Sequence, residues 1–362
     1  MRPWPDRRYL DLVGIEHPIV QAPMAGAHGA PLAIAVAEAG GLGSLPCGML
    51  GTAEAGAQLD TIRQHTDRPI NVNVFCHTPP VPDAERERRW RQRLARYTAE
   101  LGVAPGQASA AAKRAPFDAE MCALFVAKRP RVVSFHYGLP APELIQQLKR
   151  AGAILQASAT TVAEARWLER HGADAIVAQG LDAGGHRGMF LAGDPEQQVG
   201  TLALIPQIAD AVSVPVVAAG GITDARGIVA ALALGASAVQ IGTGYLLCPE
   251  ATISPAFRSA LRAARDDSTQ LTNVFSGRPA RSIVNRLMRE MGATGADVPA
   301  FPLAAGALQP LRHAAEAAQS ADFSPLFAGQ AAPLARTMGA GDLTRALASE
   351  AQALMARLGA QT

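Results

Sequence analysis

One pattern recurs along the first two thirds of this chain: an apolar run, a turn with glycine or proline, an alanine-rich helical segment and a glycine stop. The stops include Glu38-Ala39-Gly40-Gly41, His171-Gly172-Ala173 and Leu234-Gly235-Ala236. Glycine suits the position after a helix because it enters the left-handed conformation without a Cβ clash. Another apolar run follows each stop within a few residues, so the pattern predicts repeated βα units.

Eight apolar runs qualify as strands, and most are continuous rather than alternating. Continuous runs are typical of parallel strands buried on both faces. The expected strands are Ile19–Ala22, Gly43–Pro46, Ile70–Phe75, Val132–His136, Ile154–Ala157, Ala175–Gln179, Val216–Ala219 and Ala238–Ile241. Helices are expected at 31–39, 52–65, 141–150, 162–171, 201–212 and 224–234. Eight such units close naturally into a (β/α)₈ TIM barrel, and a doubly wound open sheet is the alternative.

Other segments fall outside this repeat. Residues 77–130 are long enough for two helices joined by an Ala/Gly/Ser stretch near 106–112, and Trp90, Leu94 and Tyr97 recur there at helical spacing. Residues 266–340 are rich in Gly, Pro and Ala with little strand signal. We therefore predict an α/β chain with a barrel at 1–265 carrying a helical insertion at 77–130. A smaller cap subdomain follows at 266–340, and residues 341–362 hold a C-terminal helix that packs back on the barrel.

The bulk properties exclude several classes of protein. A net charge of +2 gives no electrostatic footprint for nucleic acid. No apolar stretch is long enough to cross a membrane, and the N-terminus has no apolar signal region. The four cysteines lack ligand-like spacing, which indicates buried thiols in a reducing compartment. We expect a cytoplasmic protein, and a homodimer is possible.

Glycine turns follow the seventh and eighth expected strands. The seventh ends in Ala219-Gly220-Gly221, and the eighth in Gln240-Ile241-Gly242-Thr243. Paired glycines let backbone N–H groups approach a phosphate, and the following helix N-terminus adds a favourable dipole. Active sites of barrels form at the C-terminal ends of strands, and their phosphate sites recur at strands seven and eight. The two turns therefore predict a phosphate site, while tight βα turns without a ligand are the alternative.

Other strand ends would complete such a site. After the first strand, Ala22 and Pro23 leave room for a flat ring, and Met24 offers a polarizable contact. In the third strand, Asn71 and Asn73 share one face, so one of these amides could bond a ring carbonyl or N–H.

Two histidines follow strands at the same end of the barrel. His186 lies in the glycine-rich run after the sixth strand, and its ordinary pKa near 6.5 suits proton abstraction at neutral pH. His136 ends the fourth strand. A metal site made of this pair lacks an evident carboxylate or cysteine partner, so no metal is expected.

Together these motifs resemble the nitronate monooxygenase family, formerly called 2-nitropropane dioxygenases, which are FMN-containing barrels. The matching pieces are QAPMAG at 21–26, NVNVF at 71–75, SFHYG at 134–138, QGLDAGGHRG at 179–188, AAGGITDARGIVAALALGASAVQIGT at 218–243, NVFSGRPAR at 273–281 and FAGQAA at 327–332. The resemblance covers nearly the whole chain. It is more specific for this group of flavin barrels than for one activity within it.

The resemblance implies roles for individual residues. His186 would be the catalytic base that removes the α-proton of a neutral nitroalkane, and His136 would help to bind the nitro group. FMN would contact Ala22, Pro23, Met24, Asn73, Gln179, Gly184, Gly220, Gly221, Gln240, Ile241, Gly242 and Thr243. One departure is Asp182, where relatives often carry glutamate.

The implied reaction oxidises an alkyl nitronate, such as propionate 3-nitronate, with O₂ to a carbonyl compound and nitrite. A nitronate is an electron-rich anion, so it can reduce FMN without a nicotinamide cofactor. One alternative shares the fold and flavin: an FMN-dependent NAD(P)H-using enoyl-acyl-carrier-protein reductase or quinone reductase. A second is a flavin-free barrel lyase or isomerase that binds a substrate phosphate, and a third is a non-catalytic binding barrel.

Overall fold

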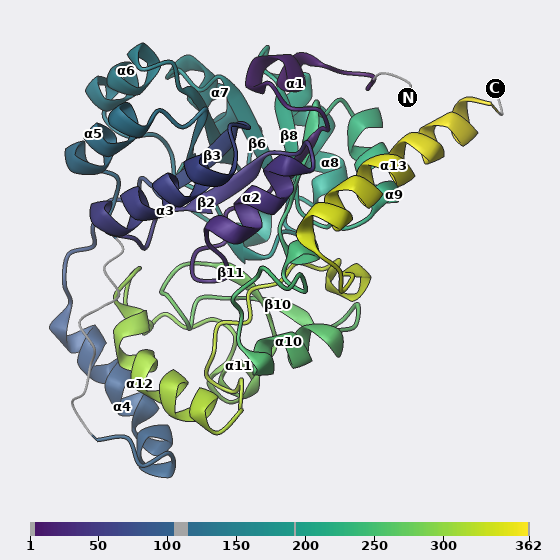
Figure 1. Cartoon of the computed structure of the whole chain (residues 1–362). Coiled ribbons are helices and arrows are strands. Elements are labelled where there is room, and N and C mark those ends of the chain that lie inside the picture. The colour runs from purple at the N-terminus through teal and green to yellow at the C-terminus, as the bar shows by residue number, and fades with distance from the viewer. Residues whose placement is uncertain (1–3, 105–114, 192, 361–362) are drawn as a thin grey trace.

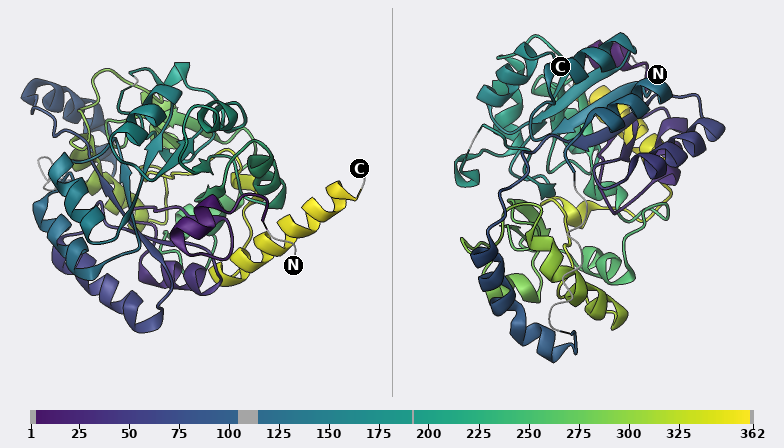
Figure 2. Two further views of the ribbon diagram at one scale, coloured as in Figure 1. Left: turned by 90° about the horizontal axis from the view of Figure 1, so that it is seen from above. Right: turned by 90° about the vertical axis from the view of Figure 1, so that its left-hand side faces the viewer.

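A computed structural model describes residues 4–104, 115–191 and 193–360. Figures 1 and 2 show two parts, a barrel ringed by helices and a second part that lies across one of its ends. The barrel strands are all parallel. They are β1 (Ile19–Gln21), β2 (Gly43–Pro46), β3 (Ile70–Phe75), β4 (Val132–His136), β5 (Ile154–Ala159), β6 (Ala175–Gln179), β8 (Val216–Ala219) and β9 (Ala238–Ile241).

The order of these strands decides between a barrel and an open sheet. They run β1-β9-β8-β6-β5-β4-β3-β2, so β1 and β2 stand at the two ends of the order. A parallel bridge between Val20 and Leu42 joins those ends, and Gln21 N–H donates to the Leu42 carbonyl at 2.9 Å. The sheet is therefore a (β/α)₈ barrel, and the open-sheet alternative is wrong. The expected strand bounds hold, except that β1 ends one residue earlier and β5 extends to Ala159.

Local signals begin and end the surrounding helices. The side chains of Thr161 and Asp224 accept hydrogen bonds from first-turn N–H groups of the helices that follow them. Gly152, Gly172 and Gly235, all at positive φ, follow helix ends as the sequence predicts. The helices are α2 (Ala30–Glu38), α3 (Thr52–His65), α6 (Pro142–Arg150), α7 (Val162–Arg170), α8 (Thr201–Ala209) and α9 (Ala225–Ala233).

The N-terminal helix α1 (Arg8–Val13) closes the barrel end away from the second part. Tyr9 is fully buried, and its hydroxyl lies 2.7 Å from Gln156 Oε1 inside the barrel. Burial raises the pKa of Tyr9, so its hydroxyl keeps its proton for this contact. The open end of the barrel is thus the one at the C-terminal ends of the strands.

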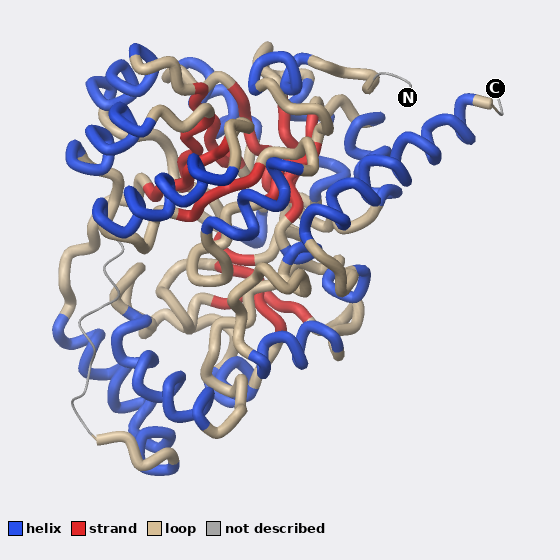
Figure 3. Tube along the Cα trace, in the orientation of Figure 1, coloured by secondary structure: helices blue, strands red, loops and turns tan. Residues whose placement is uncertain are grey.

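The second part consists of α4 (Ala84–Glu100), α10 (Pro255–Arg262), α11 (Arg286–Met291), α12 (Ala304–Ala317) and a small sheet, and we name it the cap. The sheet contains β10 (Thr269–Thr272) and β11 (Ala280–Ile283) in order β10-β11-β7, and Figure 3 shows it apart from the barrel strands. Residues 266–340 thus hold two strands that the sequence pattern did not predict. Each has only four residues, too few for a clear alternation.

The first helix of the insertion packs on the cap rather than on the barrel. The helix α4 buries Trp90, Leu94 and Tyr97, each at most 1% exposed, in a cluster with Leu308 and Leu311 of α12. The second helix of the insertion, α5 (Ala119–Lys128), contributes to the barrel core instead. The stretch 106–112 lies outside the described residues.

Strand β7 (Gly185–His186) connects the two parts. Its residues follow β6 of the barrel, yet they pair antiparallel with Ala280 and Arg281 of β11. The Arg187 N–H extends this contact by donating to the Pro279 carbonyl at 2.9 Å. A segment that leaves the barrel therefore becomes the edge strand of the cap sheet.

The C-terminal helix α13 (Ala340–Gly359) runs beside α9 and α2 on the barrel wall, where Leu343 and Leu347 are buried. Three short 3₁₀ helices, η1 (Pro195–Gln197), η2 (Thr243–Tyr245) and η3 (Ala332–Leu334), complete the structure. Within the described ranges, we find no helix with the length and apolarity that a membrane crossing requires.

Candidate active site

A cavity of about 280 Å³ lies between the C-terminal ends of the barrel strands and the cap. Its walls include every residue that the sequence predicted for the site except Ile241. Ile241 is completely buried in β9, and its carbonyl accepts a hydrogen bond from Ala22 N–H at 2.8 Å. Its side chain therefore belongs to the core, while its backbone holds the β1 loop beside the cavity.

The two glycine turns line this cavity, and N–H groups of these turns are available to a ligand. Gly220 and Gly221 have positive φ values of 119° and 65°, a conformation that favours glycine. Within the described residues, no protein acceptor meets the N–H groups of Gly220, Gly221 or Gly242. Uncommitted N–H groups at adjacent turns form a site for an anion.

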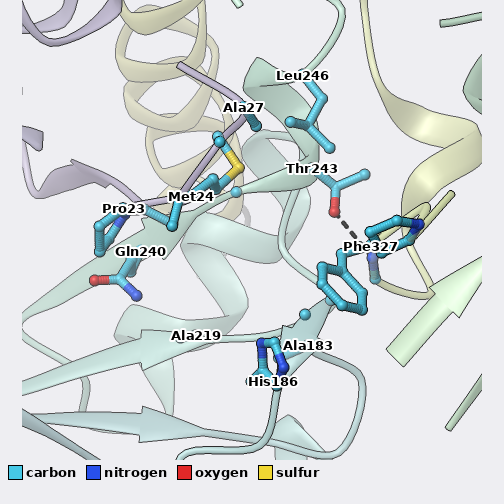
Figure 4. A pocket seen from close by; sticks show the side chains of 18 of the residues that line it. Pro23, Met24, Ala27, Ala183, His186, Ala219, Gln240, Thr243, Leu246 and Phe327 are labelled. Carbon is cyan, nitrogen blue, oxygen red and sulfur yellow. Dashed lines mark hydrogen bonds between the residues drawn. The ribbon is translucent and has the colours of Figure 1, made fainter. Parts of the chain in front are cut away.

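Thr243 joins this anion site to the cap. Its Oγ1 accepts a hydrogen bond from Gly329 N–H at 2.9 Å, which Figure 4 shows beside the ring of Phe327. The hydroxyl proton of Thr243 remains available for an anion. A Cβ on Gly184 would fall 2.4 Å from the Gly329 nitrogen, so only glycine permits this approach of barrel loop and cap.

The β1 loop forms an apolar wall opposite these turns. Pro23 and Met24 line the cavity, and Figure 4 shows both on the same side as Gln240. His28 fixes the loop because its Nε2 accepts a hydrogen bond from Met24 N–H at 3.1 Å. Burial lowers the pKa of His28 to about 4, which keeps this acceptor neutral. The wall leaves space for a flat ring, as expected.

Of the two amides on β3, only Asn73 reaches the cavity. Asn71 is fully buried and donates from Nδ2 to Ser44 Oγ at 2.9 Å. Asn73 Nδ2 donates to the hydroxyl and carbonyl of Ser134 at 2.9 and 3.2 Å. Its Oδ1 has no protein donor within the described residues, so it can accept a hydrogen bond from a ligand N–H.

Gln179 and His136 both hold the backbone of His186. Gln179 Nε2 donates to the His186 carbonyl at 2.9 Å, and Gln179 Oε1 accepts from Gly188 N–H at 2.7 Å. His136 Nε2 lies 3.2 Å from the same His186 carbonyl. Both side chains line the cavity, but their main contacts fix the loop that carries His186.

The surroundings of His136 favour its neutral form. Its Nε2 faces a carbonyl and therefore carries the proton, and its Nδ1 lies 3.0 Å from the Ser158 hydroxyl. Burial lowers the pKa of His136 to about 4, with Arg278 and Arg187 adding unfavourable charge. If His136 binds a nitro group, as the sequence resemblance implies, it would do so in its neutral form at neutral pH.

The imidazole of His186 lies on the cavity wall under cap residues. Its Nε2 is 2.7 Å from Ser276 Oγ, and its ring packs edge-on against Phe301 and Phe327, with centroids 5.5 and 5.0 Å away. Figure 4 shows Phe327 between His186 and Thr243. The base candidate therefore comes from a barrel loop, while three cap side chains form its immediate environment.

Charge in the cavity is sparse. Within the described residues, the only charged side chains on its wall are Arg312 and Glu316 of α12, which pair at 2.8 Å. The same residues contain no group of three metal-ligating side chains. An anion at the glycine turns would thus rely on N–H groups, the Thr243 hydroxyl and the start of α9.

Sequence reasoning missed several residues of this site, among them Ser276, Phe301, Phe327 and His28. Ser276 stands within a motif already noted, NVFSGRPAR at 273–281, but the motif alone gave no partner for its hydroxyl. His28 acts on the backbone of the β1 loop through its contact with Met24 N–H. Asp182 Oδ2 accepts from Thr201 N–H at 2.6 Å, so the shorter carboxylate serves the first turn of α8.

Comparison with known proteins agrees with this geometry. The family model "Nitronate monooxygenase" matches residues 7–350. A nitronate monooxygenase of Pseudomonas aeruginosa is 43% identical over 345 residues, covering 95% of this chain and 98% of its own. Another, from Paraburkholderia phytofirmans, is 43% identical over 350 residues, covering 95% of this chain and 94% of its own.

Among solved structures, nitroalkane oxidase from Streptomyces ansochromogenes superposes with a TM-score of 0.87 at 39% identity, covering 97% of this chain and 99% of that one. FabK from Thermotoga maritima has a TM-score of 0.72 at 26% identity, covering 98% and 99%. The whole-chain family match and the 43% identity together place the protein: it is a member of the nitronate monooxygenase family.

Proposed function

We propose that this protein binds FMN and uses it to oxidise alkyl nitronates with O₂. The observation that carries the proposal is a single cavity whose wall holds both the uncommitted N–H groups of the glycine turns and the imidazole of His186. The first feature suits a phosphate, and the second suits a proton acceptor beside a bound ring.

The described residues fit FMN. Gly220, Gly221, Gly242 and Thr243 would hold its phosphate, and the wall formed by Ala22, Pro23 and Met24 would lie along its ring. Asn73 Oδ1 would accept from a ring N–H. When bound, FMN would supply the electron acceptor that the protein's own side chains lack.

His186 would act on neutral nitroalkanes by taking the α-proton, and the resulting imidazolium would stabilise the nitronate anion by charge. A pre-formed nitronate needs no such step. The overall reaction balances as two nitronates and one O₂ to two carbonyl compounds and two nitrites. The cap, which consists of α4, α10, α11, α12 and the small sheet, would exclude bulk water from this chemistry.

The decisive experiment identifies the flavin released from the purified protein and measures O₂ uptake with alkyl nitronates and propionate 3-nitronate, with and without NAD(P)H. We expect bound FMN, with O₂ uptake and nitrite release that need no nicotinamide. A colourless protein without O₂ uptake would overturn the proposal. Rapid anaerobic bleaching of the flavin by NADH or NADPH, without nitronate turnover, would favour a reductase instead.

A further inference from the structure

Ser276 of the cap makes a direct contact with the proposed base. Its hydroxyl lies 2.7 Å from His186 Nε2, although 90 residues separate the two in sequence. Ser276 is 2% exposed, so water does not compete effectively for this contact. A short hydrogen bond of this kind at a partly buried base sets the orientation and proton position of its ring.

The loop that carries Ser276 allows little freedom. Gly277 follows it with a φ of 89°, and a Cβ there would fall 2.0 Å from the Pro299 carbonyl oxygen. Gly277 N–H donates to the Asn273 carbonyl at 2.8 Å. The Asn273 side chain exchanges two hydrogen bonds with the Gly295 backbone, each 3.0 Å long. The hydroxyl of Ser276 is thus presented from a fixed turn.

Hydrogen-bonding capacity indicates which group carries the proton. A serine hydroxyl donates one hydrogen bond and accepts two. Ser276 Oγ lies 3.4 Å from the Arg278 nitrogen, from which it accepts, and 3.4 Å from the Arg278 carbonyl oxygen, to which it donates. Its remaining acceptor position then accepts a hydrogen bond from His186 Nε2–H. In this arrangement the Ser276 hydroxyl donates to the Arg278 carbonyl and accepts from His186. If the hydroxyl donated to His186 instead, it could not donate to the Arg278 carbonyl.

Ser276 contacts the ring of His186 itself, at Nε2. Gln179 and His136 hold only the His186 carbonyl, and Phe301 and Phe327 restrict the ring by packing alone. The Ser276 hydroxyl therefore bears on the tautomer of the ring, which contacts to the His186 carbonyl do not set.

We infer that Ser276 is a positioning residue that holds His186 in its Nε2–H form, so that Nδ1 takes the substrate proton. This inference rests on the proposed function, with His186 as base. In the step, the α-carbon's bond to hydrogen breaks, its electron pair moves into the nitro group to form the nitronate, and the proton bonds to Nδ1. The new imidazolium keeps its Nε2–H donated to Ser276.

Kinetics of the FMN-loaded enzyme test this role with three variants. Ser276→Ala should lower kcat/KM for a neutral nitroalkane about 10- to 100-fold, the range for losing a hydrogen bond to a charged group, and leave kcat/KM for the pre-formed nitronate unchanged. Ser276→Thr keeps the hydroxyl and should recover most of the activity. Ser282→Ala removes another fully buried serine hydroxyl of the cap sheet, bonded to the Ile283 carbonyl, and should change neither substrate. Equal loss on both substrates in Ser276→Ala would overturn the inference.

The second readout needs no turnover. Nitrogen-15 NMR of histidine-labelled enzyme should give the Nε2–H tautomer for His186 in the wild type and a mixture in Ser276→Ala. An Nδ1–H signal in the wild type would overturn the inference. If the enzyme oxidises no nitronate, the proposed function fails, while the NMR result still reports whether Ser276 sets the tautomer.

Discussion

The barrel and the cap contribute to the cavity in different ways. The barrel supplies the available N–H groups of Gly220, Gly221 and Gly242, and the loop that carries His186. The cap supplies side chains around that histidine, namely Ser276, Phe301 and Phe327. The difference teaches that the available N–H groups come from the geometry of local βα turns, whereas the environment of His186 depends on a part assembled from distant segments.

The largest expected effect separates proton transfer from oxidation. His186→Asn removes the proposed proton acceptor, so turnover of a neutral nitroalkane should fall about 10²- to 10⁴-fold. Turnover of the pre-formed nitronate should be largely spared, because no proton needs to be removed. Paired O₂-uptake assays on the two substrates measure this. An equal fall on both would remove the base assignment.

Trp90→Ala tests whether the cap is a separate unit. Trp90 is 1% exposed in the cluster of α4 and α12, and its Nε1 lies 3.4 Å from the Ala304 carbonyl. Loss of a buried tryptophan costs about 3–5 kcal/mol. Hydrogen exchange should therefore quicken in α4 and α12 while strands β4 and β5 keep their protection.

Trp167→Ala is the matched control, because Trp167 is only partly buried and stacks on His171 at the barrel surface, 3.9 Å between centroids. It should leave exchange in α4 and α12 unchanged. If Trp90→Ala instead quickens hydrogen exchange in β4 and β5 as much as in α4 and α12, the two parts unfold as one.

Acid should weaken the barrel through two buried histidines. His28 and His136 both have pKa values lowered to about 4 by burial, against an ordinary value near 6.5 in the unfolded chain. Between those values the unfolded chain binds protons that the folded protein does not, so the free energy of unfolding falls as pH falls from about 6.5 to about 4. The loss is on the order of 2–3 kcal/mol per histidine.

Denaturant unfolding at a series of pH values measures how the free energy of unfolding depends on pH. His28→Gln should weaken this pH dependence over the same pH range, when each protein is compared with its own stability at neutral pH. A slope that is unchanged in His28→Gln would mean that this histidine is not held neutral.

The smallest effect concerns the start of α8. Asp182→Ala removes the acceptor for Thr201 N–H and should cost about 1 kcal/mol, the usual worth of such a helix-start contact. Asp182→Glu keeps a carboxylate and should recover part of that loss. Thermal unfolding measures both, and a variant Asp182→Ala as stable as the wild type would mean that the contact contributes nothing.

The sequence alone predicted the barrel closely because each of its units is local. An apolar run, a capped helix and a glycine such as Gly235 lie within some twenty residues of one another, and their order repeats. Strand ends then placed Asn73, His136 and His186 at one mouth, since all strands of a barrel point the same way. The exception, Ile241, stands next to Gly242, and a pattern cannot tell a lining glycine from its buried neighbour.

The cap was harder for physical reasons. Its strands β10 and β11 are short and pair with each other, and β11 also pairs with β7, a two-residue segment that no periodicity reveals. Phe301 and Phe327 meet His186 from loops more than a hundred residues away, so their roles depend on tertiary contacts. The neutral state of His136 also follows from burial, which its sequence neighbours do not specify.

The pairing of β7 has one more consequence. His186 is tied to Ala280 on the cap side and, through its carbonyl, to Gln179 and His136 on the barrel side. If the two halves swing apart to admit substrate or release product, one of these attachments must give way. An open form would therefore lose the present placement of His186, so the proposed proton transfer would have to alternate with the entry of substrate and the release of product.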